Sequence, residues 1–223
     1  MKTYKYELHL HTRQGSACAI CTGAEMVDYY KSQGYSGFLV TDHFINGNTA
    51  VDRRLPWAEQ MEEFCLGYED AKRRGDEMDF DVFFGLEFAY RGTEFLILGL
   101  DKEWLIANPQ ICKSKLEKSL KLIRANGGFV VHAHPFRQAS YINEIRLLPD
   151  LVDAVEVFNA ANRDDYWNKQ AAKFACKHNL PMTSGADSHK VGDKTAGIEA
   201  KRRVRTVAEL IDVIKNGECT MIK

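Results

Sequence analysis

Six of the seven histidines fall in four short patches of the sequence, and their types and spacing are those of metal ligands. The patches are ELHLHT with His9 and His11, TDHF with His43, VHAHPF with His132 and His134, and GADSH with His189. Imidazole together with carboxylate, without clustered thiolates, suits Zn, Mn or Fe. The same composition argues against an iron–sulfur cluster or a zinc ion held by four cysteines.

The spacing inside each patch predicts shared ligation. Side chains alternate faces along a strand, so His9 and His11 point the same way, and the pairs His132/His134 and Asp187/His189 repeat that relation. Glu87 follows the apolar run VFFGL and adds a carboxylate. Four histidine patches and Glu87 occupy the same topological position, after or at the end of an apolar run. This favours joint metal binding over polar residues that are each satisfied separately. These candidates exceed the four to six ligands of one ion, which indicates at least two ions able to clamp a phosphoryl oxygen.

Two other features have simpler interpretations. His178 stands next to Asn179 in a helical context and is expected at a surface or helix end. Cys18 and Cys21 form a single CxxC pair, which is compatible with a redox site, but nothing else resembles a thioredoxin-like unit. In a chain of this length without an export signal, the six cysteines are expected to be reduced.

The histidine patches must be positioned by an alternation of strands and helices. Apolar, β-prone runs predict strands at residues 6–10, 37–40, 81–86, 95–99, 129–131, 154–158 and 181–184. Helical periodicity predicts helices from Thr22 to Gly34, at 57–74, 116–123 and 167–175, and from Thr206 to Gly217. Capping boxes are expected at Thr22 and Thr206, and the run at 95–99 is expected to form a hairpin or a neighbouring strand with the run before it. The polar patches then lie near the carboxyl ends of parallel strands, where sites in α/β folds form.

Composition narrows the class of protein. The 223 residues are expected to form one domain spanning 1–223, because a chain of this length can bury one full core. Thirty basic and 31 acidic residues give a formal net charge of −1, and no basic stripe interleaved with aromatics is present, so no nucleic-acid partner is expected. No apolar run is long enough for a membrane span, and a cytoplasmic location is expected.

These motifs resemble the PHP (polymerase and histidinol phosphatase) family of metal-dependent phosphoesterases. HxH, TDH, a Glu after a strand, HP and G-x-D-x-H occur in family order, from ELHLHT to the segment near Gly197. The resemblance implies a distorted, TIM-like (β/α)7 barrel with two or three divalent ions of Zn, Mn or Fe. It assigns His9, His11, Glu87 and Asp187 to one ion, Glu87 and His134 to a second, and His43 and His189 to a third. It also implies that Asp42 orients a ligand.

Two family positions differ in this chain. Ala17 and Leu96 stand where many members carry further histidines, so the second and third sites each look one ligand short. Cys18 is a candidate thiolate beside the first gap. His132 is a candidate for the second gap, although substrate contact or ligand orientation is its expected role.

The expected reaction is hydrolysis of a small phosphomonoester or phosphodiester by a metal-bound hydroxide, with Glu87, Asp187 and His189 as the catalytic residues. The expected substrate contacts are Arg13, Arg137, Asn159 and His132. Arg suits this role because its guanidinium can make bidentate hydrogen bonds to a phosphate. Arg53 and Arg54 are further candidates from a neighbouring loop. The alternatives are a metal-dependent hydrolase of carbon–nitrogen bonds and a non-catalytic metal-binding or regulatory module. The sequence does not specify the substrate, the metal or the oligomeric state.

Overall fold

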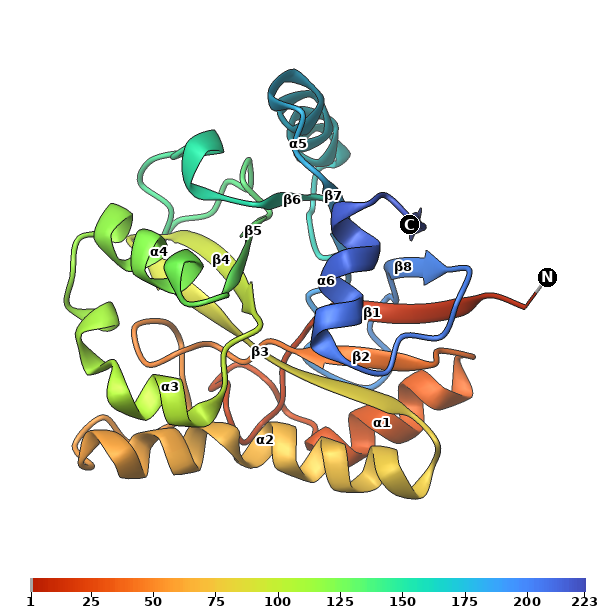
Figure 1. Cartoon of the computed structure of the whole chain (residues 1–223), viewed down its shortest axis with the longest axis horizontal. Helices are drawn as coiled ribbons and strands as arrows, with labels where there is room; N and C mark the ends of the chain where they lie inside the picture. Colours follow the sequence, from red (N-terminus) through yellow and green to blue (C-terminus); the bar gives the residue numbers. More distant parts are fainter. Residues whose placement is uncertain (1) are drawn as a thin grey trace.

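The computed structural model describes residues 2–223 as a nine-stranded sheet flanked by helices (Figure 1). The strands are β1 (Tyr4–Leu10), β2 (Gly37–Val40), β3 (Asp81–Tyr90), β4 (Thr93–Leu98), β5 (Phe129–Ala133), β6 (Ala154–Asn159), β7 (Met182–Gly185), β8 (Gly197–Ala200) and β9 (Cys219–Ile222). The helices are α1 (Gly23–Ser32), α2 (Trp57–Glu77), α3 (Lys102–Ala107), α4 (Leu116–Ala125), α5 (Asp165–His178) and α6 (Val207–Lys215), with short 3-10 turns at Pro109–Cys112 and Pro149–Leu151. No helix of this described part is long and apolar enough to cross a membrane.

The sheet curls into a nearly closed barrel. Its strand order is β7-β6-β5-β4-β3-β2-β1-β8-β9, and the segment after β7 returns to the end of β1. There the amide of His11 donates to the carbonyl of Ser188 at 2.9 Å, and the amide of Ser188 donates to the carbonyl of His9 at 3.2 Å. These bonds bring the first and seventh strands together, and the expected distorted, TIM-like barrel is confirmed.

One antiparallel strand distorts the barrel. β4 pairs antiparallel with both β3 and β5, whereas β1–β2–β3 and β5–β6–β7 are parallel runs. Arg91 and Gly92 join β3 to β4 with φ angles of 51° and 84°, as a tight hairpin turn requires. The expected hairpin is therefore confirmed.

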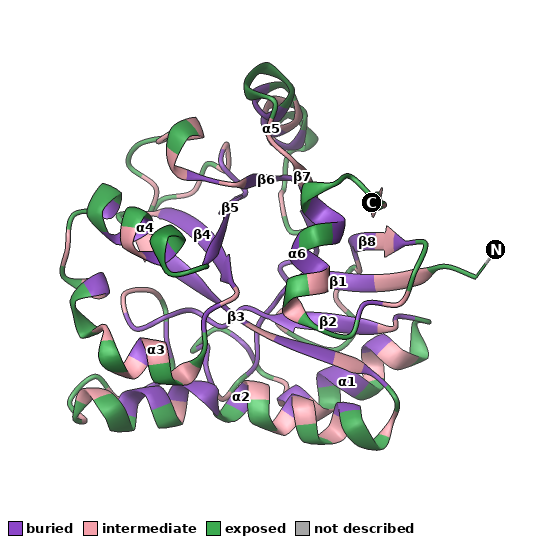
Figure 2. Ribbon diagram, in the orientation of Figure 1, coloured by how far each residue is buried: buried purple, intermediate pink, exposed green. Residues whose placement is uncertain are grey.

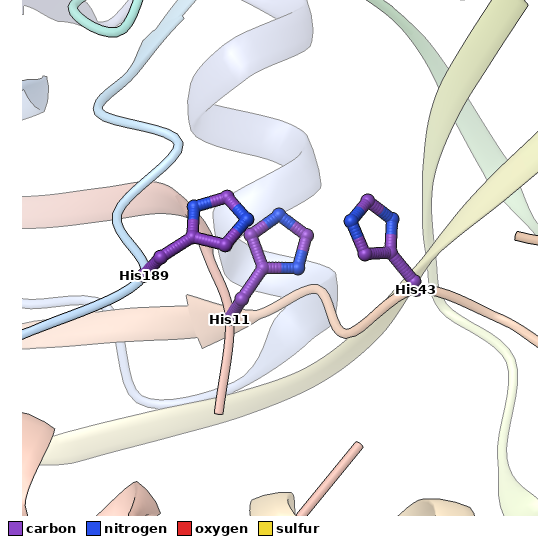
Figure 3. A group of neighbouring side chains, drawn as sticks. All are labelled: His11, His43 and His189. Carbon is purple, nitrogen blue, oxygen red and sulfur yellow. The ribbon is translucent and has the colours of Figure 1, made fainter. Parts of the chain in front are cut away.

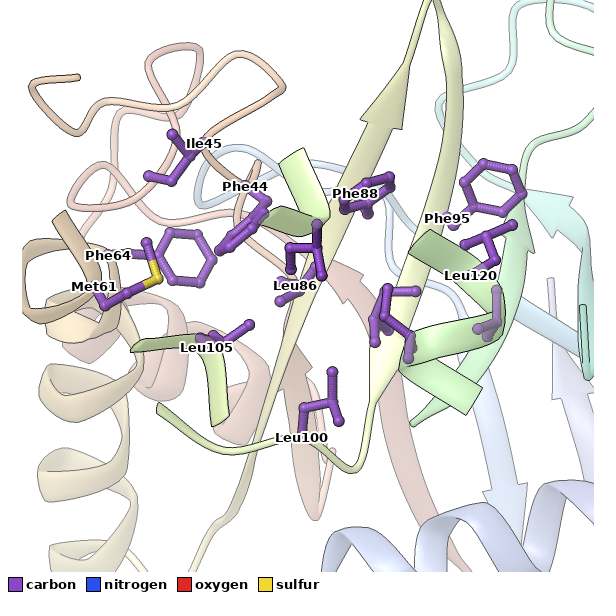
Figure 4. Packing of buried hydrophobic residues seen from close by; sticks show 14 of the residues in the cluster. Phe44, Ile45, Met61, Phe64, Leu86, Phe88, Phe95, Leu100, Leu105 and Leu120 are labelled. Atoms are coloured by element: carbon purple, nitrogen blue, oxygen red, sulfur yellow. The ribbon is translucent and has the colours of Figure 1, made fainter. Parts of the chain in front are cut away.

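Apolar side chains pack on both faces of the barrel sheet, inside the barrel and between the sheet and the outer helices. Inside, Leu39, Leu96 and Val131 from the strands pack against Leu210 and Ile214 of α6, which lies across one end. Outside, the strands pack against α2, α3 and α4 through a second cluster, and Figure 4 shows Phe44, Phe64 and Phe88 within it. Figure 2 shows the resulting pattern, with buried strands and with helices that are buried on one side only.

The element predictions agree with the structure at the long periodic segments. Both capping boxes are present: the Thr22 hydroxyl accepts from the amide of Glu25, and the Thr206 hydroxyl accepts from the amide of Glu209. Several short elements were not predicted: the helix α3, the two 3-10 turns, strand β8, which pairs with β1 and β9, and the edge strand β9. β3 also runs on to Tyr90 beyond the predicted end at Leu86, because it pairs with β4 along the whole hairpin.

Candidate metal centre

A β-bulge near the end of β1 turns the first two histidines inward. Glu7 pairs with Phe38 and Leu10 pairs with Val40, so Leu8 and His9 together stand opposite a single residue of β2. A bulge of this kind re-aims side chains and is common next to functional sites. Leu10 consequently packs outward among the residues beneath α1, while His9 and His11 are fully buried with ring centroids 5.2 Å apart.

Two further residues of the cluster follow other strands of the barrel and have left-handed backbone angles. His134 follows β5 with a φ of 26°, and Asp187 follows β7 with a φ of 57°. Non-glycine residues in this region are strained, and such strain concentrates at functional sites. Glu87 comes from within β3 and pairs by a β-bridge with His43, so the expectation that it lies just past a strand end is wrong.

Glu87 lies at the centre of a histidine cluster. Its Oε1 is 3.2 Å from His9 Nε2 and 3.3 Å from His134 Nε2. Its Oε2 is 2.6 Å from His43 Nδ1 and 3.6 Å from His11 Nε2. Burial opposes ionisation of this carboxyl, but the facing His43 and His9 outweigh it and hold the pKa of Glu87 well below its usual range.

The cluster divides into overlapping groups whose donor atoms lie within 4.8 Å of one another. The groups are His9/Glu87/His134, His9/His11/Asp187, His11/His43/His189 and His43/Glu87/Glu94. Figure 3 shows the three rings of the third group, and the His11 ring lies 4.3 Å from that of His189 and 4.4 Å from that of His43.

Several donor atoms in this cluster are buried and have no hydrogen-bond partner within residues 2–223. They are His9 Nε2, His11 Nε2, His43 Nδ1 and Glu87 Oε2. The last two lie 2.6 Å apart but do not have the geometry of a hydrogen bond. Buried polar atoms almost always have a partner, so unpartnered atoms that converge on one place indicate a cation-binding site. The donor set of imidazoles and carboxylates therefore fits divalent metal ions.

Residues behind the cluster hold its histidines in place. His9 Nδ1 donates to Glu156 Oε1 at 2.9 Å, and Glu156 Oε2 accepts from the amide of His134 at 2.9 Å. Partners of this kind fix the ring orientation and tautomer of a metal-binding histidine. Sequence analysis missed Glu156, although a carboxylate in the apolar run AVEVF was an available signal.

Asp42 acts on His11 through an intermediate hydroxyl. Its carboxylate accepts from the Ser16 hydroxyl at 2.7 Å, and that hydroxyl oxygen accepts from His11 Nδ1 at 3.0 Å. Thr12 donates to the same carboxylate through both its amide and its hydroxyl, each at 2.6 Å. The arrangement agrees with the expected orienting role of Asp42.

A second missed carboxylate organises the backbone around the cluster. Glu7 Oε1 accepts from the amides of Leu8, His9 and Ala186 at 2.8–2.9 Å, which links the bulge of β1 to the end of β7. Burial raises the pKa of Glu7 to about 7. Its signal in the sequence was an acid inside the strand YELHL.

The cluster opens into a cavity of about 730 Å³. Arg53, Arg91 and Arg137 line it together with Cys18 and Glu94. Burial alone would raise the pKa of Cys18, but hydrogen bonds from His189 and His43 outweigh it and lower the pKa to about 6. The cavity is thus lined by positive side chains beside the convergent ligand atoms.

The four expected substrate contacts take different positions. Arg137 lines the cavity, but its Nη1 lies 2.7 Å from Asp187 Oδ2 and its Nη2 donates to Asn159 Oδ1 at 2.8 Å. Asn159 is buried behind Arg137 and donates to Glu156, so it positions other side chains and does not face the cavity. Arg13 is exposed and lies outside the cavity lining. Neither Asn159 nor Arg13 lines the cavity, and their role as substrate contacts stays a prediction.

His132 does not share the face of His134, which overturns its expected role as a substrate contact or replacement ligand. It is fully buried on the outer side of β5, where its ring stacks on Phe95 at 5.0 Å and meets Phe174 at 6.5 Å. The left-handed backbone at His134 breaks the strand alternation, so the two histidines part. Near Leu96 it is Glu94 that reaches the cluster, with its Oε2 3.6 Å from His134 Nε2.

Comparisons with known proteins identify one matching family model and several solved structures of similar fold. A family model described as PHP-associated matches residues 165–219. A two-domain protein from Bacteroides vulgatus, which contains a predicted PHP-like metal-dependent phosphoesterase, has a TM-score of 0.74 at 14% identity; the match covers 99% of this chain but only 64% of that one. The family model matches one segment of this chain, and the solved structure shares its fold.

Further solved structures share the fold of this chain. A proposed metal-dependent phosphoesterase from Bifidobacterium adolescentis has a TM-score of 0.61 at 15% identity, with 94% of this chain and 95% of that chain covered. An amidohydrolase from Chromobacterium violaceum has a TM-score of 0.58 at 16% identity, with 97% of each chain covered. No curated protein matches the sequence. Because a shared fold does not establish a shared function, the reaction of this chain has to be inferred from its own cavity.

Proposed function

We propose that this chain is a metal-dependent phosphoesterase that hydrolyses a small phosphomonoester or phosphodiester. The observation that carries the proposal is the convergence of four histidines on Glu87 in a cavity lined by arginines. A volume of about 730 Å³ suits a small molecule.

The ligand groups follow the overlapping donor sets. We assign His9, His11, Glu87 and Asp187 to one ion, Glu87 and His134 to a second, and His43 and His189 to a third. Glu87 would be shared by the first two sets, because its Oε1 faces His9 of the first set and His134 of the second. When bound, such ions neutralise phosphoryl oxygens and lower the pKa of water, which removes the need for a Ser or Cys nucleophile.

Protein side chains prepare the cavity for an anionic group. Arg137 holds Asp187 while its charge faces the cavity, and burial among acceptors keeps the guanidinium fixed. His189 Nδ1 donates to the carbonyl of Asp187 at 2.8 Å, which leaves its Nε2 free to bind an ion. Arg53 donates to the carbonyls of Ile45 and Gly47 and so fixes the loop that forms one wall.

The test is elemental analysis of protein purified without chelator, followed by assays on phosphate esters and on amides with the recovered metal. We expect at least two ions per chain and turnover of phosphate esters, with both lost in Asp187→Asn. Arg137→Lys should raise KM for phosphate esters because the planar fork is lost, whereas Arg13→Lys, outside the cavity, is the matched control. Metal-loaded protein that hydrolyses no ester would contradict the proposal.

A second candidate is hydrolysis of a carbon–nitrogen bond. The shared fold with an amidohydrolase supports it, since the same donor set polarises carbonyl oxygens as well as phosphoryl oxygens. Turnover of amides without turnover of phosphate esters would select this candidate. Metal binding without turnover of either class would indicate the non-catalytic module.

A further inference from the structure

Glu94 points into the barrel beside the histidine cluster. Side chains two residues apart on a strand share a face, and Leu96 of β4 packs inside the barrel. In the sheet, Glu94 pairs with Ala133, the residue before His134. On the other side of β4, Leu96 pairs with Glu87. The antiparallel strand therefore brings a carboxylate between the strand that carries Glu87 and the strand that leads to His134, and this carboxylate lines the cavity.

The Glu94 carboxylate lies close to donor atoms of three other residues. Its Oε2 is 3.6 Å from His134 Nε2. Donor atoms of Glu94, Glu87 and His43 lie within 4.8 Å of one another and form one of the four ligand groups of the cluster. Two atoms in this group, Glu87 Oε2 and His43 Nδ1, are buried and have no hydrogen-bond partner in the described part of the chain. These unpartnered atoms independently indicate a cation beside Glu94.

The charge of Glu94 is poorly offset by the protein itself. The residue is 9% exposed, and its only ion-pair partner within residues 2–223 is His134. At 3.6 Å that contact is too long for a hydrogen bond. Glu87, a second buried carboxylate, belongs to the same ligand group. Buried carboxylates are normally paired or bound to a metal ion, because an unpaired charge is costly away from water. The two acids together therefore favour a cation between them.

We propose that Glu94 is a ligand of the second ion, together with Glu87 and His134. The inference rests on the proposed metal-dependent function and adds to it a ligand and a metal preference. Glu87 and His134 alone would give this ion two protein ligands, whereas a catalytic metal site commonly has three. With Glu94 the set becomes two carboxylates and one imidazole. Carboxylate suits Mn and imidazole suits Zn, so this composition shifts the second site toward Mn.

Glu144 provides a matched control from the loop that follows His134. Glu144 and Glu94 line the same small hollow beside the cavity. The Glu144 carboxylate, however, is exposed and lies 2.6 Å from Arg146 Nη2. It belongs to none of the ligand groups formed by the described residues. Glu144→Gln therefore removes one negative charge near the cavity without removing a proposed ligand.

The experiment is titration of the metal-free protein with Mn(II), in which electron paramagnetic resonance measures the unbound ion. We expect at least two bound equivalents in the unaltered protein and in Glu144→Gln. Glu94→Gln should weaken binding of one equivalent by at least about tenfold, because loss of an outer partner alone costs that much. Glu94→His should regain that equivalent with Zn(II) in preference to Mn(II), as measured by competition with a chromophoric chelator. Recovery by histidine would show that β4 still folds and that position 94 needs a donor atom.

Three outcomes would overturn the ligand role of Glu94 and leave the histidine–carboxylate centre in place. The first is unchanged Mn(II) stoichiometry and affinity in Glu94→Gln. The second is an equal loss in Glu144→Gln, because charge near the cavity would then explain the effect. The third is an equivalent that is lost in Glu94→Gln and regained with neither metal in Glu94→His.

Two further outcomes separate this inference from the proposed function. The expected metal titrations without turnover of any phosphate ester would contradict the proposed reaction and support the ligand role of Glu94. Failure of the unaltered protein to bind Mn(II) or Zn(II) would overturn both.

Discussion

The chemistry of single residues in this protein depends on the partner behind each donor atom. Nε2 of His9 faces Glu87, while its Nδ1 is held by Glu156, a fully buried carboxylate in β6. The charges of Asp187, Glu156 and Glu87 outweigh the effect of burial and hold the pKa of His9 well above its usual value in the absence of metal. An ion would have to displace that proton, so these carboxylates tune metal affinity as well as geometry.

Glu156→Gln is predicted to weaken metal binding. The amide keeps the size of the side chain but removes the charge that orients His9, and loss of such a partner typically costs about 10- to 100-fold in affinity. Competition with a chromophoric chelator measures the change. Glu117→Gln, on the exposed face of α4, is the control, and equal affinities in the two variants would contradict the role of Glu156.

His132 is predicted to make the metal-free protein acid-sensitive. Both of its ring nitrogens are buried without a hydrogen-bond partner among residues 2–223, and burial together with His134 lowers its pKa to about 3. The unfolded chain binds a proton below pH 6.5 while the folded chain does not, so stability is complete above pH 6.5. It falls by up to about 1.4 kcal/mol per pH unit as the pH drops toward 3.

His132→Phe should reduce that acid sensitivity and raise stability, since an apolar ring suits the contacts with Phe95 and Phe174. Urea unfolding at pH 7 and pH 5.5 measures both effects. His178→Phe, at the exposed end of α5, is the matched control. A pH dependence that is identical in the two variants would reject the assignment.

At the scale of elements, irregular strands position the cluster. The bulge in β1 turns His9 and His11 inward, and a register shift in β6 accompanies the placement of Glu156. Between these strands β7 ends at Gly185, which has no side chain to separate it from β1. A Cβ atom there would lie 2.5 Å from His9 Cβ and 2.5 Å from Glu156 Oε1.

Gly185→Ala is predicted to disturb the metal centre through this contact. The methyl group must push His9 and Glu156 apart, and overpacking of a filled interior costs about 1 to 3 kcal/mol. Urea unfolding and metal titration should both show losses. Gly47→Ala is the comparison, because its Cβ would meet its nearest neighbours at 3.4 Å. An unchanged metal affinity in Gly185→Ala would contradict the prediction, because it would show that β7 can accommodate a methyl group without moving His9 or Glu156.

At the scale of the whole molecule, barrel closure gathers ligands that are far apart in the sequence. His11 directly follows β1 and Asp187 follows β7, and they meet where the end of the first strand pairs with the segment after the seventh. The closure buries a set of acids and histidines whose mutual charges are satisfied only in part. Bound ions are expected to stabilise this arrangement because they bind the folded chain and have no such site in the unfolded one.

Metal removal is therefore predicted to lower the melting temperature. An ion at 100 times its Kd contributes about 2.7 kcal/mol, which corresponds to roughly 5 to 10 °C for a chain of this size. Differential scanning calorimetry with and without chelator measures the shift. Asp187→Asn should abolish most of it, and a chelator-insensitive melting temperature in the unaltered protein would contradict metal binding at the barrel end.

The sequence by itself determined the chemical type of the site and the order of most of the strands and helices that position it. Period-2 runs, helical periodicity and the capping boxes at Thr22 and Thr206 are local patterns, and local patterns are legible without the fold. The histidine patches, Glu87 and Asp187 were likewise recognisable because their residue types limit the chemistry. Only the tertiary structure decided which side chains face one another. The left-handed backbone of His134 separates it from His132, and the bulge in β1 turns His9 and His11 inward. The approach of β7 to β1 brings Glu7 and Glu156 behind the cluster. Which side chains point toward one another depends on strand register and barrel closure. Both are set by contacts between distant segments, and neither produces a periodic pattern in the sequence.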